Sequence, residues 1–284
     1  MGSPARACLR IVAYLAVTAP LLPVQAVAVV LKLRLARTLP LSYHRLVCRI
    51  LGIRVVVHRQ LALARPMLIV GNHSSYLDIE VLGSLIPGSF VAKVEVAGWL
   101  FFGWLAKLQR SVFIERRSSK AREHKDEIEK RLLEGDMLIL FPEGTSDDGN
   151  RPLPFRSALF SVAERRIEGA PLVVQPISLA YTRLDGMPMG RSFRPFFAWY
   201  GDMALPTHLW RMLGLGVLTA EVSFHEPVTI DRFGSRKALA EHCWRVVSEG
   251  MATLLAGRPQ RLPGPDPQPA PNAAELAAPG ALSR

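Results

Sequence analysis

Short apolar runs recur along the chain between residues 53 and 224, and glycine or proline stands at the end of many of them. These runs are too short for buried helices, so the pattern predicts strands. The predicted strands cover residues 53–58, 66–70, 90–93, 111–114, 137–141, 172–180 and 219–224.

Between these runs, apolar positions recur with helical spacing. The pattern predicts an amphipathic connector at 38–52 and helices at 79–86, 118–133 and 236–255. Strands that alternate with helices indicate an α/β fold. We therefore expect a single domain at 38–256 with a mixed, mostly parallel central sheet flanked by helices and preceded by an N-terminal membrane helix. An aromatic, apolar patch at 98–105 belongs either to the core or to a membrane-dipping surface.

The N-terminal segment is long and uncharged from Ile11 to Leu31, with basic residues on both sides. Its 21 residues are enough to cross the hydrocarbon core of a bilayer. Pro20 and Pro23 would kink a helix there, and a cleaved signal peptide is the competing interpretation. We expect residues 1–37 to anchor the chain, either across the membrane or embedded in one face of it.

The C-terminal segment differs in composition from the apolar N-terminal segment. Residues 257–284 hold seven prolines among alanine and glycine, too few large apolar residues to form a core. This composition predicts a disordered tail.

Charge and cysteine content narrow the function. The 35 Lys and Arg residues exceed the 24 Asp and Glu residues, giving a net charge of +11 that suits a nucleic acid, an anionic membrane or a phosphate-bearing substrate. The chain has no zinc-ligand spacing and no aromatic-interleaved basic stripe, so we expect neither nucleic acid nor metal as a partner. Cys8, Cys48 and Cys243 are widely scattered, which is typical of thiols in a reducing compartment.

The most informative segment follows the predicted strand 66–70. It places His73 five residues before Asp78. In a regular helix two such residues are rotated by about 140° from each other, so they meet only if His73 lies in the turn and Asp78 in the first helical turn. Asp78 would then hold one ring nitrogen and leave the other free to take a proton from a substrate hydroxyl. Taken alone, such a pair is more often an incidental histidine beside a surface carboxylate, since short motifs match often by chance.

Two further predicted strands end in polar groups. The strand 111–114 leads into Arg116, whose guanidinium could bind phosphate oxygens in a bidentate manner. The strand 137–141 stops at Pro142 in a turn containing Glu143, Gly144 and Thr145. Gly144 permits backbone N–H groups to approach an anion, and Glu143 could bind hydroxyls or brace an arginine. Each segment alone is also compatible with an ordinary surface turn.

Four segments occur in a fixed order. They are Asn-His-Ser-Ser-Tyr-Leu-Asp at 72–78, Phe-Ile-Glu-Arg at 113–116, Phe-Pro-Glu-Gly-Thr at 141–145 and Val-Gln-Pro-Ile at 174–177. Over about residues 50 to 230 the chain resembles the glycerolipid acyltransferases of the 1-acylglycerol-3-phosphate acyltransferase family. That family carries N-H-x4-D, F-I-x-R, F-P-E-G-T and a proline-containing strand.

The resemblance implies acyl transfer from acyl-CoA or acyl-carrier protein to the free hydroxyl of a lysolipid, with no cofactor and no metal. It implies that His73 is the general base, that Asp78 orients it, and that Arg116 binds the acceptor phosphate. The acceptor-binding turn would be formed by Glu143, Gly144 and Thr145. The residues expected to shape the site are Asn72, Pro142 and Pro176. The implied location is the cell inner membrane, with the site at the cytoplasmic face.

Two departures from the family pattern bear on the acceptor. The third motif usually continues with Arg and Ser, whereas here Ser146-Asp147-Asp148-Gly149 follows. In addition, segments 185–188, 198–203 and 208–210 look like a bacterial subgroup that includes lyso-ornithine lipid acyltransferases. Because Arg116 offers a phosphate partner, we favour 1-acylglycerol-3-phosphate as acceptor, with lyso-ornithine lipid as the alternative.

Functions of other classes remain open at this point. A non-catalytic lipid-binding membrane protein would use the basic surface and the anchor, and would not depend on His73 or Asp78. A metal-dependent phosphoesterase built on His73, Asp78 and Glu143 would need more ligands than the sequence offers.

Overall fold

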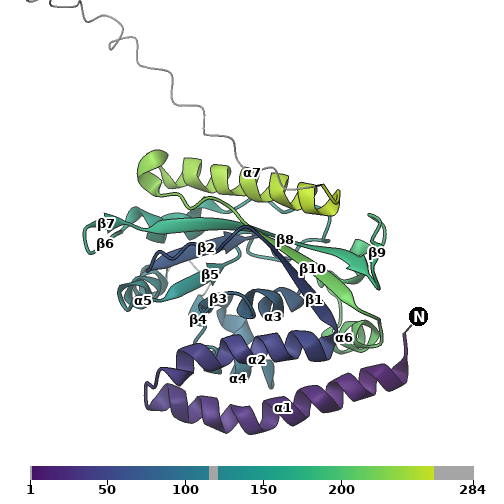
Figure 1. Ribbon diagram of the computed structural model, residues 1–284. Helices are drawn as coiled ribbons and strands as arrows, with labels where there is room; N and C mark the ends of the chain where they lie inside the picture. Colours follow the sequence, from purple (N-terminus) through teal and green to yellow (C-terminus); the bar gives the residue numbers. More distant parts are fainter. Residues whose placement is uncertain (1, 115–120, 259–284) are drawn as a thin grey trace, which may run out of the picture.

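The computed structural model describes residues 2–114 and 121–258, with the side chains of 121–125 left aside. Most of the expected tail therefore lies outside the described residues. The described chain forms a central sheet with helices on both faces (Figure 1). The expectation of an α/β domain with a mixed, mostly parallel sheet is confirmed.

The sheet has the strand order β1-β10-β8-β2-β5-β3-β4. Its strands are β1 (Ile53–His58), β2 (Met67–Gly71), β3 (Ser89–Lys93), β4 (Val112–Ile114), β5 (Met137–Leu140), β8 (Val173–Leu184) and β10 (Leu218–Phe224). Along this order every neighbouring pair is parallel except β8 and β10, which are antiparallel. The short strand β9 (Met187–Pro188) pairs with β8, whereas β6 (Arg166–Ile167) and β7 (Ala170–Pro171) form a separate two-stranded sheet.

The central strand β2 is buried on both faces, as expected for a parallel strand covered by helices. Its side chains alternate between two apolar cores. Met67 and Ile69 join the core beneath the helices near the N-terminus, whereas Leu68 and Val70 join the core on the opposite face. The carboxyl ends of β2 and β5 lie side by side, since Val70 is paired with Leu140. Groups that follow these two strands therefore meet at one edge of the sheet.

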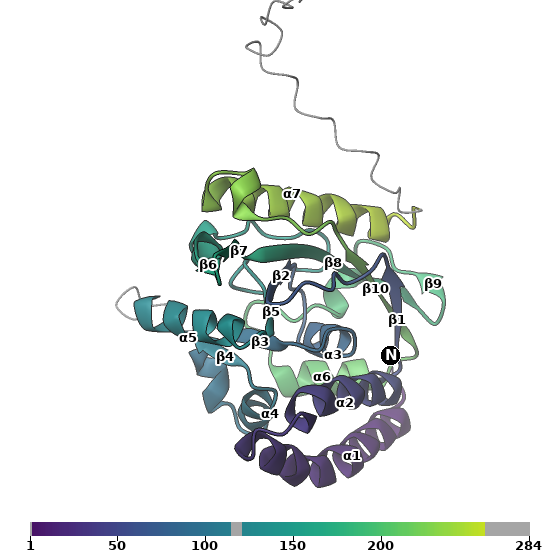
Figure 2. The same ribbon diagram turned by 60° about the vertical axis from the view of Figure 1, so that its left-hand side comes forward.

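Helices cover the two faces unequally. Figures 1 and 2 show α7 (Arg236–Leu255) along one face, with α2 (Leu35–Leu51), α3 (Leu77–Gly83) and α6 (Leu205–Leu213) on the other side. The remaining α-helices are α1 (Pro4–Val30), α4 (Phe102–Leu108) and α5 (Ala121–Leu133). The 3₁₀ helices are Val94–Gly98, Ser157–Glu164, Arg194–Phe196 and Ile230–Arg232.

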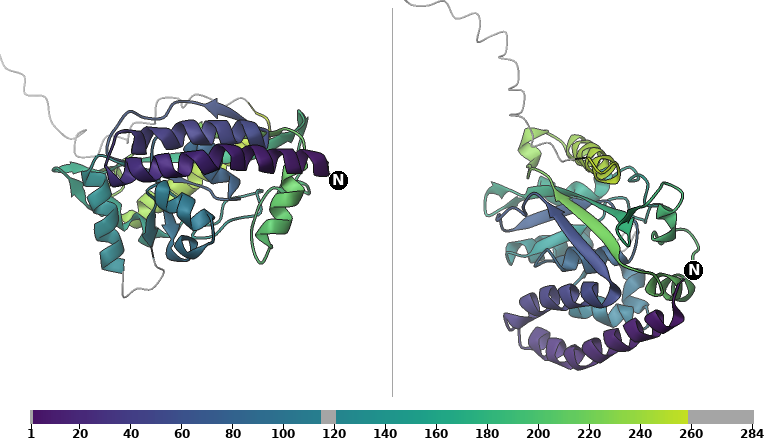
Figure 3. Two further views of the ribbon diagram at one scale, coloured as in Figure 1. Left: turned by 90° about the horizontal axis from the view of Figure 1, so that it is seen from below. Right: turned by 45° about the vertical axis from the view of Figure 1, so that its right-hand side comes forward.

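The N-terminal helix α1 lies flat against the domain, alongside α2 (Figure 3). The Arg10 guanidinium fastens it there by donating to the carbonyl oxygens of Leu213, Leu215 and Gly216 at 2.9 to 3.0 Å. The helix continues through Pro20 and Pro23. Within the described residues, α1 is the one helix long and apolar enough to cross a membrane, and most of its side chains face outward.

The sequence pattern located the main elements well. The strand 53–58 and the helix 236–255 appear with the predicted bounds, and the other predicted strands and the helix 79–86 appear with shifted ends. The helix predicted at 118–133 is described from Ala121 to Leu133, and the amphipathic connector is α2. The connector begins earlier than the pattern predicts, since α2 begins at Leu35. The patch at 98–105 exposes Leu100 at 91% and Trp104 at 65%, so it is largely surface. The pattern missed α4, α6 and the short strands β6, β7 and β9.

Candidate active site

His73 and Asp78 are in contact in the connection between β2 and α3. The His73 Nδ1 atom lies 2.8 Å from Asp78 Oδ2. His73 stands in the turn and Asp78 in the first turn of α3, which is the arrangement that the five-residue spacing required. The structure therefore brings the predicted pair together.

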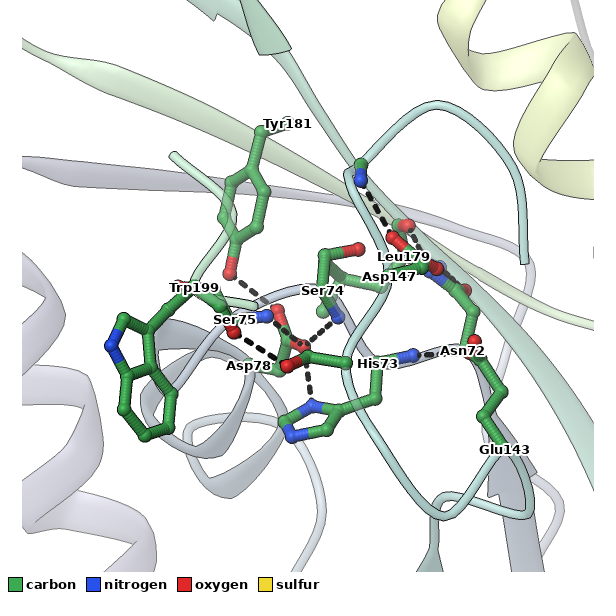
Figure 4. Close-up of polar contacts among 12 residues, drawn as sticks. Asn72, His73, Ser74, Ser75, Asp78, Glu143, Asp147, Leu179, Tyr181 and Trp199 are labelled. Atoms are coloured by element: carbon green, nitrogen blue, oxygen red, sulfur yellow. Dashed lines mark hydrogen bonds and ion pairs between the residues drawn. The ribbon is translucent and has the colours of Figure 1, made fainter. Parts of the chain in front are cut away.

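The Asp78 carboxylate is fully buried and receives several hydrogen bonds (Figure 4). The backbone N–H groups of Ser74 and Ser75 donate to Oδ2 at 2.7 and 2.9 Å. The Tyr181 hydroxyl donates to Oδ1 at 2.6 Å. Polar residues 72–75 thus form the turn, but the residue at the N-cap position is Tyr76, and the side chain that binds the turn is Asp78.

Groups on three sides fix the position of His73. Its ring stacks on the Phe141 ring with centroids 4.3 Å apart. Its backbone N–H donates to Glu143 Oε1 at 2.8 Å, and its carbonyl oxygen accepts from the Asp147 N–H at 2.7 Å. The His73 side chain is 23% exposed, and Nε2 has no hydrogen-bond partner among the described residues. The imidazole therefore presents one bound nitrogen and one that an incoming group can reach.

Glu143 lies behind the His73 turn. It is 2% exposed, and its second oxygen accepts from the Leu153 N–H at 2.7 Å. Because each carboxylate oxygen already binds a backbone N–H group, Glu143 joins the His73 turn to residue 153. This brace differs from the expected contact with the acceptor or with an arginine.

Gly144 and Thr145 form the outer part of the same turn. Gly144 has a φ of +71°, a conformation in which glycine is unstrained, and Thr145 is exposed. The Arg156 guanidinium lies over this turn, since a Cβ atom built on Gly144 would be 3.2 Å from Arg156 Nε. The Arg156 N–H donates to the Pro142 carbonyl oxygen at 2.9 Å. The predicted acceptor turn therefore has a cation beside it, Arg156, which the sequence motifs did not indicate.

The three residues expected to shape the site occupy structural positions. Asn72 pairs with the Leu179 backbone on β8, donating to its carbonyl oxygen and accepting from its N–H, both at 2.9 Å. Pro176 is opposite Val70 in the pairing of β8 with β2. Pro142 is buried at the start of the turn. Arg116 lies outside the described residues.

Two buried carboxylates adjoin His73. Burial raises the pKa of Glu143, and the nearby charge of Asp147 raises it further. Burial also raises the pKa of Asp147, although hydrogen bonding from the Gly149 N–H opposes the change. In the described part of the chain, Asp147 Oδ2 has no hydrogen-bond partner, and no cluster of His, Cys, Asp and Glu is arranged to hold a metal ion.

An apolar cavity of about 420 Å³ lies between α1, α2, α3, α4 and α6. Phe90, Tyr76 and Leu77 are part of its wall. Phe90 is 6.3 Å from Phe141, the ring that stacks on His73, so the cavity begins two rings away from the imidazole. The Phe90 and Phe141 rings therefore lie between the cavity and the imidazole.

A second histidine–carboxylate pair lines this cavity. His44 Nδ1 lies 2.7 Å from Glu80 Oε2, and His44 Nε2 lies 3.0 Å from Gln109 Oε1. Burial lowers the pKa of His44, but the Glu80 charge and the two hydrogen bonds outweigh it, so the net shift is upward. His44 is thus a buried, fully bonded group.

Comparison with known proteins supports the motif assignment. A family model described as Acyltransferase matches residues 52–180. A lyso-ornithine lipid O-acyltransferase of Rhizobium meliloti (strain 1021) is 41% identical over 258 residues, covering 89% of this chain and 88% of that protein. The Brucella abortus (strain 2308) protein of the same name is 43% identical over 257 residues, covering 89% and 96%.

A more distant relative and a solved structure also match this chain. A 1-acyl-sn-glycerol-3-phosphate acyltransferase of Neisseria gonorrhoeae is 31% identical over 188 residues, covering 64% of this chain and 70% of that protein. The crystal structure of the 1-acyl-sn-glycerophosphate acyltransferase PlsC from Thermotoga maritima matches with a TM-score of 0.55 at 21% identity, covering 79% of this chain and 81% of that one. By sequence identity over most of its length, and by the fold it shares with PlsC, this chain belongs to the acyltransferase family.

Proposed function

We propose that this acyltransferase esterifies the free hydroxyl of a lysolipid with a fatty acyl group taken from a thioester, and that its acceptor is lyso-ornithine lipid. The observation that carries the reaction is the His73–Asp78 pair, with Nδ1 held at 2.8 Å and Nε2 open to an incoming group. A thioester on CoA or on acyl-carrier protein has the chemistry required of the donor.

In this reaction His73 Nε2 takes the proton of the acceptor hydroxyl as its oxygen attacks the thioester carbonyl carbon. Asp78 stabilises the imidazolium and keeps Nδ1 protonated. The C–O bond forms, the C–S bond breaks, and the leaving thiolate takes the proton from His73. No covalent acyl-enzyme is needed, because the acceptor brings its own nucleophile.

The choice of acceptor rests on the relatives and on the chemistry near the turn. The two relatives that align over 89% of the chain are named for lyso-ornithine lipid, whereas the phosphate-acceptor relative aligns over 64%. Segment 198–203, which resembles that subgroup, adjoins the site, since the Trp199 N–H donates to the Ser74 carbonyl oxygen at 2.8 Å. These observations favour lyso-ornithine lipid over 1-acylglycerol-3-phosphate.

Arg156 is our candidate for binding the anionic group of the acceptor headgroup. It lies over Gly144, is exposed, and forms no ion pair within the described residues. Lyso-ornithine lipid carries a headgroup carboxylate, which a guanidinium can bind in a bidentate manner. Arg156 would thereby supply the cation that the motif lacks at Ser146.

The cavity and the outer face of α1 suit a lipid substrate. The cavity wall is mainly apolar and begins near His73, so it can hold an acyl chain. The exposed apolar side chains of α1 and of the patch at 98–105 form one layer, and they include Leu9, Val12, Val27, Val30, Leu100 and Trp104. Because Arg10 holds α1 against the domain, we infer that α1 is embedded along one leaflet instead of crossing it.

We place this layer at the inner membrane with the site on the cytoplasmic face. Cys8, Cys48 and Cys243 are all free thiols, as is typical of a reducing compartment. A thioester donor is also drawn from that side.

The test is an acceptor panel with the purified protein in lipid vesicles. Wild type should acylate lyso-ornithine lipid faster than 1-acylglycerol-3-phosphate with acyl-CoA or acyl-carrier protein as donor. The His73→Ala variant should lose about a thousandfold or more in rate and still float with the vesicles. Full activity in that variant would contradict the mechanism, and a preference for 1-acylglycerol-3-phosphate would contradict the acceptor.

A further inference from the structure

Tyr181 holds the side of Asp78 that faces away from His73. Its hydroxyl lies 2.6 Å from Asp78 Oδ1, whereas the other three hydrogen bonds to this carboxylate go to Oδ2 (Figure 4). Tyr181 is on β8, 103 positions from Asp78 in the chain. The two oxygens of Asp78 are therefore held by separate parts of the fold.

The hydroxyl of Tyr181 is a permanent donor. Ionised Asp78 can only accept hydrogen bonds, so the proton between the two groups belongs to the phenol. Burial raises the pKa of Tyr181 well above its ordinary value, and the Asp78 charge raises it further. Tyr181 is 5% exposed and Asp78 is 0% exposed, so bulk water has no access to take over this contact.

We propose that Tyr181 is a positioning residue that fixes Asp78 and limits the negative charge available to His73, and so sets the basicity of the catalytic imidazole. The proposal rests on the proposed function, in which His73 is the general base. A hydrogen bond to a carboxylate stabilises its charged form and makes it a weaker acceptor for its other partners. Without the phenol, Oδ1 is buried without a donor, and Oδ2 attracts the imidazolium proton more strongly.

The test is the pH dependence of kcat/KM for the Tyr181→Phe variant. Phenylalanine keeps the ring and removes only the donor. The acidic limb of the profile should move to higher pH by about half to one unit, because His73 becomes more basic. The value of kcat below the new limb should fall several-fold, while KM for both substrates stays within about twofold of wild type.

Thr182→Val is the matched control. Thr182 is the next residue on β8, and its hydroxyl also donates to a carboxylate, Glu221 Oε1, at 2.7 Å. This variant removes a buried hydroxyl–carboxylate bond from the opposite face of the strand, and its pH profile should superimpose on wild type. An equal shift in both variants would show a general effect on the strand and overturn the proposal.

A substitution of opposite sign covers the case in which Tyr181→Phe fails to fold. Replacing Tyr181 with 3-fluorotyrosine makes the phenol a stronger donor, so the acidic limb should move to lower pH. An unchanged profile in a folded variant, phenylalanine or fluorotyrosine, would overturn the proposal. Activity retained by His73→Ala would instead reject the proposed function, so the two failures are distinguishable.

Discussion

The molecule contains two histidine–carboxylate pairs with nearly the same bond and different surroundings. His73 binds Asp78 at 2.8 Å and His44 binds Glu80 at 2.7 Å, in both cases through Nδ1. Both carboxylates come from α3, two residues apart. The pairs differ at the other ring nitrogen, because His44 Nε2 is bound to Gln109 whereas His73 Nε2 has no partner in the described chain.

This difference shows that a hydrogen bond between a histidine and a carboxylate is not enough to let the histidine act as a general base. The His44 side chain is 6% exposed and its ring is bonded on both sides, so it cannot exchange a proton with a substrate. His73 is partly exposed, and its carboxylate is held by donors that do not involve the ring. Under the proposed function, the base is the histidine whose carboxylate is satisfied without the ring and whose second ring nitrogen is open.

The largest expected effect is that of Asp78→Asn. The amide oxygen takes the Oδ2 position, where the N–H groups of Ser74 and Ser75 require an acceptor, so the change removes the negative charge that stabilises the His73 imidazolium. We expect kcat to fall by about 10³- to 10⁴-fold, as for the aspartate of a serine protease triad. Steady-state kinetics with saturating acyl-CoA measure it. If the loss were no larger than that caused by Glu80→Gln, the distinction between the two pairs would fail.

The second prediction compares stability when each histidine is removed. His44→Leu leaves the Glu80 carboxylate without its hydrogen-bond donor beside an apolar cavity, which should cost about 3–5 kcal/mol in unfolding free energy. His73→Leu leaves Asp78 bound to Ser74, Ser75 and Tyr181, so it should cost only about 1 kcal/mol.

Chemical denaturation at several pH values measures both variants. The deficit of His44→Leu should shrink at low pH, where Glu80 can be protonated. Adding Glu80→Leu should recover most of it, because no unpaired charge then remains. Equal costs for His44→Leu and His73→Leu would show that Asp78 depends on its histidine as Glu80 does.

The third prediction concerns the anionic group of the acceptor. Arg156→Gln should raise KM for lyso-ornithine lipid about tenfold, because a neutral side chain cannot pair with the headgroup carboxylate. The value of kcat should change little, since His73 and Asp78 remain in place. Arg151→Gln is a suitable control. Arg151 is exposed in the same segment, but the atoms nearest to a Cβ built on Gly144 all belong to Arg156. Equal KM values for the two variants would remove Arg156 from the site.

The contact between His73 and Asp78 could be predicted because it is local. The turn and the first turn of α3 are adjacent in the chain and bring the two side chains within reach of each other, and distant segments then hold the pair in place. Burial of the strands could be predicted for the same reason, since each apolar run is continuous in sequence. The parallel order of β2 and β5 then places residues 72–78 and 141–145 at one edge of the sheet.

Contacts between distant segments could not be predicted in this way. Glu143 reads as an outward residue of a turn, but Leu153 returns over it and supplies the second N–H group that buries it. Tyr181 lies one residue beyond the predicted strand 172–180, and only the pairing of β8 with β2 brings its hydroxyl to Asp78. Helix α6 is short, begins near a proline, and has no charged first turn to mark it.

The smallest expected effect tests whether the His73 turn carries its own destabilising charge. Burial raises the pKa of Asp147 from 3.8 to about 7, so the folded state holds a proton that the unfolded state has already lost. Stability linked to Asp147 is therefore present below pH 4 and is lost as the pH rises to about 7. Asp147→Asn keeps an acceptor for the Gly149 N–H and removes the charge on the unpartnered Oδ2.

Asp147→Asn should therefore match wild type in unfolding free energy near pH 4 and exceed it at pH 8. Denaturation curves at the two pH values measure this difference, and Asp148→Asn, whose carboxylate is bound by Asn150, is the control. A wild type as stable as Asp147→Asn at pH 8 would show that the charge costs nothing there. In that case the polar groups of the His73 turn would be as fully hydrogen-bonded as those of the His44–Glu80 pair. The two histidine–carboxylate pairs would then differ only in how far the imidazole is exposed.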